Sequence, residues 1–230
     1  DFTVVRIGPQ RIARDDRSDD VLATSGVHIG GTDFDQRLNL ECVMPEFGFR
    51  HLGPLGREVP SSVFFDLSTW HLIHWQQTPR AIAQTQNLRS NYSDLRLHDR
   101  LMKVLRQADG HRIAGAVEEA KIDASVRNAV ARIDLDDAAA GLFATLTPLD
   151  MRQQLAPQLD DVIACAHACV QRAGLRSGDL DAIYLTGGSS ALDPFRQALR
   201  RAFSDVAQVE GDLFGGVAAG LAYAARTRGL

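Results

Sequence analysis

The chain has 230 residues, of which 45% are hydrophobic and 23% are charged; this ordinary globular composition excludes collagen, long coiled coils and disordered chains. Its formal net charge of −4 provides no basic field for nucleic acid or an anionic membrane surface. No run approaches the roughly 18 apolar residues that a membrane-spanning helix needs. The three cysteines, an odd number, argue against a disulfide framework and favour a reducing, cytoplasmic compartment.

Two strands are predicted near the start of the chain. The first covers Thr3 to Ile7, a β-branched run that ends at Gly8-Pro9, and the second covers Val21 to Thr24. Because the chain opens without Met inside a strand-like run, we expect it to belong to a longer protein. The intervening acids predict a solvated loop or hairpin end. They lack the alternate spacing and closing Glu of a calcium loop, which favours a hydrated turn over a metal site. These acids are Asp15, Asp16, Asp19 and Asp20.

The next segment predicts a helix that begins at Thr32. Thr32 and Asp35 have the spacing of a capping box. Phe34, Leu38 and Cys42 follow at i, i+4 and i+8 and predict one apolar face. The later elements expected in this middle region are a loop over 45–60, helices over 61–75, 97–107 and 113–125, and a strand over 129–135.

Two sets of candidate metal ligands are weak. His71 and His74 lie at i, i+3 without an evident third ligand, and Cys165, His167 and Cys169 share one helix. Tetrahedral zinc needs four converging ligands. The favoured interpretation of both sets is structural, and we expect no bound metal from them alone.

A long helix is predicted to begin at Thr147. Thr147 as the N-cap, Pro148 at N1 and Asp150 at N3 form a strong start signal. Pro157 is expected to kink or restart this helix, which ends near Gly174. Its predicted apolar face consists of Leu159, Val162, Ile163, Ala166 and Val170.

The last third predicts a strand, a glycine corner and a helix. Ala182 to Leu185 is the continuous apolar run of a strand buried on both faces of a mainly parallel sheet. Gly187-Gly188-Ser189 follows, and Asp193-Pro194 begins the helix. Successive glycines let backbone N–H groups converge on a phosphate, but a tight strand–helix turn explains the two glycines equally well. A short strand over 206–209 and a Gly- and Ala-rich helix over 214–222 that can pack closely on a neighbour complete the chain.

A second candidate site lies on the predicted helix over 113–125. Glu118, Lys121 and Ser125 are spaced i, i+3, i+7 and share one helical face. Their carboxylate, ammonium stem and hydroxyl could contact the ribose and base of a nucleoside. From spacing alone, a solvated polar face is the favoured interpretation. The sequence shows no nucleophile–base pair and none of the common phosphate-loop or hydrolase motifs.

Taken together, three segments resemble the ATPase domain of DnaK-type heat-shock chaperones, and in particular its bacterial YegD-like branch. Gly30 to Leu38 resembles the family's Gly-Gly-x-Asp-Phe-Asp-x-x-Leu segment. Glu118 to Ser125 resembles the adenosine-contacting helix, and Tyr184 to Ser189 resembles a late phosphate and adenosine loop. The segments occur in the family's order, and the resemblance covers nearly the whole chain.

The resemblance implies an α/β fold, the second lobe of an actin-like (ribonuclease H-like) ATPase. Residues 1–30 and 148–230 would form the base subdomain, and residues 31–147 an inserted, mainly helical α+β upper subdomain. The full-length protein would bind ATP or ADP with Mg²⁺ and hydrolyse ATP in a cleft completed by an upstream lobe. The present chain alone would be inactive in hydrolysis.

The resemblance also implies roles for individual residues. Asp1 would be a catalytic acid near the metal-bound phosphates. Ile122 and Ala191 stand where some members of the family carry the two arginines that sandwich adenine, and Phe214 stands where an acid is usual, near Asp212. The implied nucleotide-binding residues are Gly30, Gly31, Glu118, Lys121, Ile122, Ser125, Gly187, Gly188, Ser189 and Ala191.

These departures leave an alternative open. The chain could be a non-enzymatic interaction scaffold of actin-like fold whose nucleotide contacts have decayed. In either case possible partners are co-chaperone or client proteins rather than nucleic acid or membrane. A sugar kinase or filament protein is disfavoured by the segment from Gly30 to Asp35 and the long helical insertion after it.

Overall fold

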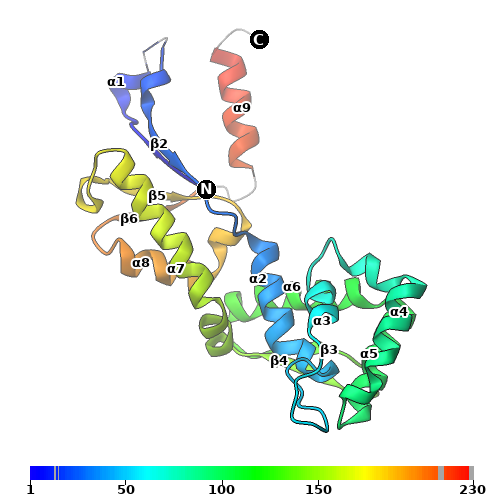
Figure 1. The fold of residues 1–230 in the computed structure, drawn as a ribbon. Helices are drawn as coiled ribbons and strands as arrows, with labels where there is room; N and C mark the ends of the chain where they lie inside the picture. The colour runs from blue at the N-terminus through cyan, green and yellow to red at the C-terminus, as the bar shows by residue number, and fades with distance from the viewer. Residues whose placement is uncertain (13, 15, 212–214, 228–230) are drawn as a thin grey trace. The chain divides into compact units, whose positions relative to one another are not determined.

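The computed structural model describes residues 1–12, 14, 16–211 and 215–227, and combines helices with small sheets (Figure 1). The chain folds into two compact units. We call residues 1–29 with 156–230 the split unit, and residues 30–155 the continuous unit. The sequence-based division instead breaks after residues 30 and 147. The second position differs because one helix, α7 (Pro148–Arg172), contributes residues to both units.

The split unit contains two pairs of strands. β1 (Phe2–Val5) runs antiparallel to β2 (Val21–Ser25), and β5 (Ala182–Leu185) runs parallel to β6 (Ala207–Glu210). Among the described residues, each pair forms its own two-stranded sheet. The predicted strands at these four places are therefore present, within one or two residues of the expected ends.

The core of the split unit lies between α7, β5 and α8 (Asp193–Ala202), with β1 side chains packed against it. Most of the predicted apolar face of α7 is buried, whereas Ile163 packs at the edge of the cluster. His167 stacks on Phe203 at a centroid distance of 4.6 Å. The buried cluster consists of Ala166, Val170, Leu185, Leu199, Phe203 and Val206.

β5 is not buried on both faces, contrary to the expectation from its apolar run. Leu185 is buried against the core, but Tyr184 is 62% exposed. Because neighbouring side chains on a strand point to opposite faces, the core covers only the face that Leu185 occupies.

The final helix is α9 (Gly216–Thr227), whose Gly- and Ala-rich sequence would allow close packing on a neighbour. Residues 218–222 are exposed, so the capacity of this helix for close packing stays a prediction. Asp212 and Phe214, which carry one of the predicted departures, lie outside the described residues.

The acidic stretch near the start connects β1 to β2 at the end of their hairpin, as expected, but it is more structured than a hydrated turn. After the short helix α1 (Pro9–Ile12) and the 3-10 turn η1 (Ser18–Asp20), Asp20 is only 6% exposed. Its carboxylate pairs with Arg11 Nε at 2.8 Å and Arg17 Nε at 2.6 Å. The hydrated-turn prediction is therefore wrong for Asp20, because interleaved arginines supply partners for a buried acid. Asp15 lies outside the described residues.

The continuous unit is mainly helical and includes one antiparallel hairpin, β3 (Ala131–Asp134) with β4 (Phe143–Leu146). The strand predicted over 129–135 is β3, whereas β4 was not predicted. The other elements are α2 (Gly31–Leu38), the π-helical turn η2 (Asn39–Val43), the 3-10 turns η3 (Met44–Phe47), η4 (Ile73–Gln77) and η5 (Asn87–Asn91), and the helices α3 (Ser62–Ser68), α4 (Pro79–Gln86), α5 (Leu95–Gln107) and α6 (Gly110–Arg127).

The helix predicted over residues 61–75 is interrupted. It divides into α3 and η4, and Thr69 has an extended backbone between them. The Thr69 hydroxyl donates a hydrogen bond to the Phe65 carbonyl at 2.7 Å. A β-branched residue with a local hydrogen bond to the backbone competes with helix continuation, which explains the break.

Thr147 caps the start of α7, as predicted, and it forms a capping box with Asp150. The Asp150 amide donates to Thr147 Oγ1 at 3.0 Å, and the Thr147 amide donates to Asp150 Oδ2 at 3.2 Å. The predicted restart at Pro157 is wrong, because the helix continues through this residue to Arg172 (Figure 1). Among the described residues, no helix combines the length and apolar character needed to cross a membrane.

Replacing Thr147 with Ala should destabilise the chain by about 1 kcal/mol, because an orphan helical N–H loses its acceptor. Urea unfolding followed by circular dichroism measures this loss. Gln153→Ala, at an exposed position of the same helix, is the matched control and should be nearly neutral. Equal effects of the two variants would contradict a stabilising cap.

Candidate functional site

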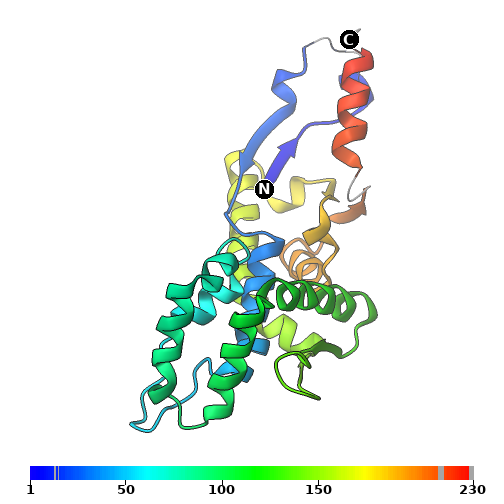
Figure 2. The ribbon, with the colours of Figure 1, turned by 90° about the vertical axis from the view of Figure 1, so that its right-hand side faces the viewer.

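Helix α6 carries the residues expected to contact a nucleoside, and Figure 2 shows it in green. Its apolar side packs into the continuous unit through Ile113, Val117, Ala120 and Ala124. Glu118 is exposed on the helix surface. Ile122 is 48% exposed, and Ser125 is half-buried. These last three residues, at i, i+4 and i+7, therefore share a face that reaches solvent.

Among the predicted site residues on this helix, Lys121 is the exception, because it is buried and paired. It is only 6% exposed, and its Nζ lies 2.7 Å from Asp35 Oδ1 on α2. Burial raises the pKa of Asp35 above its ordinary value; the Lys121 ammonium opposes this rise, and the Glu118 carboxylate adds to it. The ion pair thus fixes α6 against α2, and Lys121 acts first as a positioning residue within the unit.

The start of α2 explains why Asp35 is available for this pair. Gly30 is the N-cap, and its amide donates to Asp33 Oδ2 at 2.8 Å. The predicted capping box of Thr32 with Asp35 is therefore wrong, because Asp33 takes the capping role and the helix begins at Gly31. Gly30 and Gly31 thereby form the entry to the helix that holds the partner of Lys121.

The diglycine corner follows β5 in the split unit. Gly187 has a φ of 82°, a left-handed conformation that favours glycine, and space is open where a Cβ would stand. Gly188 begins the 3-10 turn η7 (Gly188–Ala191). The sequence analysis missed that Ser190 is buried and donates its hydroxyl to the Gly187 carbonyl at 2.7 Å. The corner is consequently a fixed turn with its two glycines exposed.

Asp1 lies in the same unit as this corner. Its carboxylate contacts Gly26, where an added Cβ would clash with Oδ1. Asp1, Thr186 and Ser190 all line one cavity. The structure therefore brings Asp1 and the two ends of the glycine corner to a shared cavity within the split unit.

The predicted site residues belong to two separate groups. Gly30, Gly31 and the four residues on α6 lie in the continuous unit, and the remaining five lie in the split unit. Ser189 and Ala191 both belong to the turn η7 and are half-buried. Ala191 offers no flat side chain on which a base could stack.

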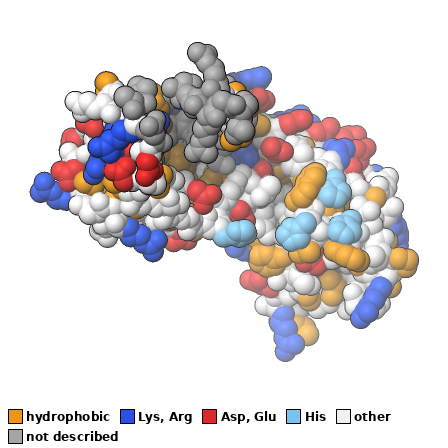
Figure 3. Space-filling model, turned by 90° about the horizontal axis from the view of Figure 1, so that it is seen from above, with side chains coloured by type: hydrophobic (Ala, Val, Ile, Leu, Met, Phe, Trp, Pro, Cys, Tyr) orange, Lys and Arg blue, Asp and Glu red, His pale blue; other side chains and the backbone are white. Residues whose placement is uncertain are grey.

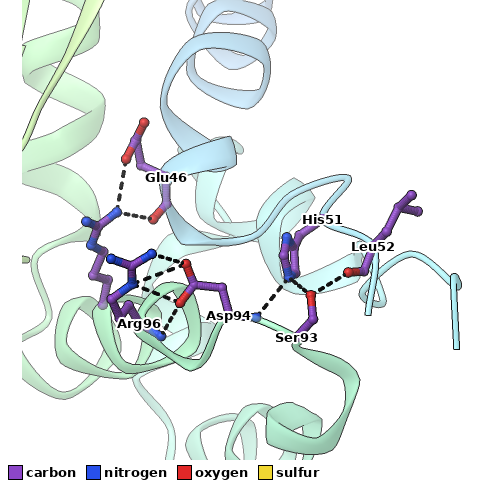
Figure 4. A network of polar contacts seen from close by, with 7 residues as sticks. Glu46, His51, Leu52, Ser93, Asp94 and Arg96 are labelled. Carbon is purple, nitrogen blue, oxygen red and sulfur yellow. Dashed lines mark hydrogen bonds and ion pairs between the residues drawn. The ribbon is translucent and has the colours of Figure 1, made fainter. Parts of the chain in front are cut away.

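A serine–histidine contact that sequence reasoning missed joins the loop after η3 to the start of α5 (Figure 4). Ser93 Oγ lies 2.8 Å from His51 Nε2. The same nitrogen accepts the Asp94 amide at 3.2 Å, and the Ser93 hydroxyl can donate to the Leu52 carbonyl at 2.8 Å. The Asp94 carboxylate is paired with Arg96, and the hydrogen bonds from Arg96 lower its pKa to about 2. The arrangement holds a loop and does not form an acyl-transfer triad.

Histidine and hydrophobic side chains also gather at the surface (Figure 3). Trp70 stacks edge-on to His111 at 4.7 Å, and His74 lies 4.6 Å from Trp75. Among the residues that the structure describes, no group of three or more His, Cys, Asp or Glu could hold a metal ion. Burial raises the pKa of Cys42 to about 11, which disfavours a reactive thiolate there.

No protein-family model matches the chain.

Replacing Lys121 with Met should raise the pKa of Asp35 further, because the offsetting ammonium is lost. A raised folded-state pKa gives stabilisation that is complete below the unfolded value of 3.8 and is lost as pH rises through the folded value. The variant should therefore lose stability relative to the parent as pH rises above 3.8, by about 3 kcal/mol at neutral pH. Urea unfolding across this pH range measures the loss.

Lys103→Met on α5 is the matched control, because Lys103 is exposed. Its stability should follow that of the parent at every pH. Parallel stability curves for both lysine variants would contradict a buried pair at Lys121.

Proposed function

We propose that this chain is one lobe of a chaperone-like ATP-binding protein. It would contribute the adenosine side and one phosphate loop of a nucleotide cleft of actin-like fold. An upstream lobe of the same protein would complete the cleft, and the chain alone would not hydrolyse ATP. A cytoplasmic location and contacts with co-chaperone or client proteins belong to the same proposal.

The observation that carries this proposal is the open diglycine corner after β5. Gly187 has its positive φ and exposed surface, and Gly188 continues the exposed backbone. Phosphates can approach a backbone closely where no Cβ intervenes. A tight turn would explain the conformation of Gly187, but it does not require both glycines to remain exposed.

The exposed face of α6 supports the adenosine side of the proposal. The Glu118 carboxylate reaches solvent from a helix whose orientation is fixed by the Lys121–Asp35 pair. Such a carboxylate can accept two hydrogen bonds from ribose hydroxyls. In this assignment Glu118 and Ser125 contact the nucleoside, Ile122 offers an apolar surface to the base, and Lys121 positions the helix.

Asp1 would act near the metal-bound phosphates when nucleotide and Mg²⁺ are present. It shares a cavity with Thr186 at the start of the glycine corner, which fits an acid placed beside a phosphate loop. Phosphoryl transfer depends on positioning and charge stabilisation around the γ-phosphate. A chain with one phosphate loop supplies only part of that environment.

The second candidate function is a non-enzymatic interaction scaffold of the same fold. Two observations favour it: Ala191 provides no stacking surface, and Asp35 already neutralises the ammonium of Lys121. A missing stacking contact costs about 1 kcal/mol of binding free energy. The two candidates differ in whether the full-length protein binds nucleotide at all.

Calorimetry of the full-length protein with Mg²⁺–ATP distinguishes them. The parent should bind, and Glu118→Ala should weaken binding about 10- to 100-fold through lost charged hydrogen bonds. Gly188→Val should abolish binding by blocking the backbone. The present chain alone should show no ATP turnover above background.

Glu119→Ala is the matched control, because Glu119 is exposed on α6 next to Glu118. It should bind ATP like the parent. Absence of binding by the parent would support the scaffold and refute the nucleotide-cleft proposal.

A further inference from the structure

Arg196 connects the diglycine corner to the end of the neighbouring strand. Its Nε donates a hydrogen bond to the Ser190 carbonyl at 3.0 Å, and its Nη1 lies 2.5 Å from Glu210 Oε1. Ser190 belongs to the turn η7, Arg196 belongs to α8, and Glu210 is the last residue of β6. One guanidinium group therefore ties three consecutive elements of the split unit together.

The turn that receives this bond frames the exposed amides of the corner. The Gly187 carbonyl accepts both the Ser190 amide at 3.1 Å and the Ser190 hydroxyl at 2.7 Å. Ser190 is thus anchored to Gly187 on one side and, through its own carbonyl, to Arg196 on the other. Among the described residues, neither Gly187 nor Gly188 donates its amide hydrogen to an acceptor. The anchored turn consequently presents two exposed N–H groups.

The anchor on Glu210 lies at the carboxyl end of a parallel pair of strands. Glu210 of β6 is in register with Leu185 of β5, and the Gly211 amide donates to the Leu185 carbonyl at 3.3 Å. Ligands of open α/β sheets bind beyond this end of the strands. Because the corner follows β5 directly, Arg196 fixes it against the end of the sheet.

The simplest role of the Arg196 contacts is structural. A guanidinium group that caps a turn carbonyl satisfies a backbone acceptor, and a surface ion pair adds little stability. The side chain of Arg196 is 20% exposed and that of Glu210 is 59% exposed. The bond has a further consequence, however, because the capped carbonyl lies three residues after Gly187. Loosening it releases the backbone that presents the two free amides.

We propose that Arg196 and Glu210 are positioning residues for phosphate binding at the diglycine corner. Glu210 orients Arg196, Arg196 holds the Ser190 end of the turn, and Ser190 holds the Gly187 carbonyl. The amides of Gly187 and Gly188 are thereby preorganised to receive the phosphates of a nucleotide. This inference rests on the proposed function, because it assigns residues that support the same phosphate loop without contacting the ligand.

Hydrogen exchange by NMR on the 230-residue chain tests the positioning without a ligand. In Arg196→Met the Ser190 amide should exchange about tenfold faster, because the turn loses a hydrogen bond from a charged donor. Exchange of the Val170 amide, in the buried core on α7, should not change. Arg200→Met is the matched control, because Arg200 is exposed on α8, and it should leave both amides unchanged.

Glu210→Gln keeps the shape of the side chain and provides a milder second variant. It should accelerate exchange of the Ser190 amide about two- to threefold, through the loss of an exposed charge contact. Unchanged exchange at Ser190 in both Arg196→Met and Glu210→Gln would overturn the positioning role.

Calorimetry of the full-length protein with Mg²⁺–ATP and with adenosine tests the link to phosphate binding. Arg196→Met should weaken ATP binding about tenfold and change adenosine binding less than about twofold. Arg200→Met should match the parent for both ligands. A merely structural role would weaken both ligands alike, and that result would overturn this inference.

The outcomes separate this inference from the function on which it rests. Absence of ATP binding by the parent would refute the nucleotide-cleft proposal and this inference with it. ATP binding by the parent that Arg196→Met leaves unchanged would overturn this inference alone. A selective loss of ATP affinity in Arg196→Met, together with faster exchange at Ser190, would support both.

Discussion

The buried pair of Lys121 with Asp35 is the interaction on which the arrangement of α2 and α6 depends. An ammonium group removed from water is costly unless a carboxylate lies beside it, and here the two atoms are 2.7 Å apart. The residual burial cost appears in the raised pKa of Asp35. Because the two residues come from different helices, either helix can rotate only by separating the charges.

This constraint fixes which side of α6 faces solvent. With Lys121 turned inward, Glu118, Ile122 and Ser125 form the surface of α6 that a ligand could contact. The rigidity of that surface is useful for recognition, since groups held in place lose less entropy on binding. The diglycine corner obtains its shape from a different source, the hydrogen bond from Ser190 to the carbonyl of Gly187.

Features that depend on residues close together in the sequence were predicted better than features that depend on residues far apart. The Thr147–Asp150 cap was readable because both partners lie within one helical turn, and β1, β2, β5 and β6 followed from short apolar runs. Two acids near the start of α2 competed for one capping role, so pattern alone assigned it to the wrong one. The partner of Lys121 lies far away in the sequence, and spacing along α6 could not identify it. The pairing of β5 with β6 likewise joins residues more than twenty positions apart, which no local pattern encodes.

A double-mutant cycle on Lys121 and Asp35 tests the central claim most directly. Urea unfolding at pH 7 would compare Lys121→Met, Asp35→Asn and the double variant with the parent. A direct buried pair predicts a coupling free energy of about 1–3 kcal/mol, with the double variant less destabilised than the two single losses combined. Additive losses, within about 0.5 kcal/mol, would show that the two groups do not interact and would contradict this account.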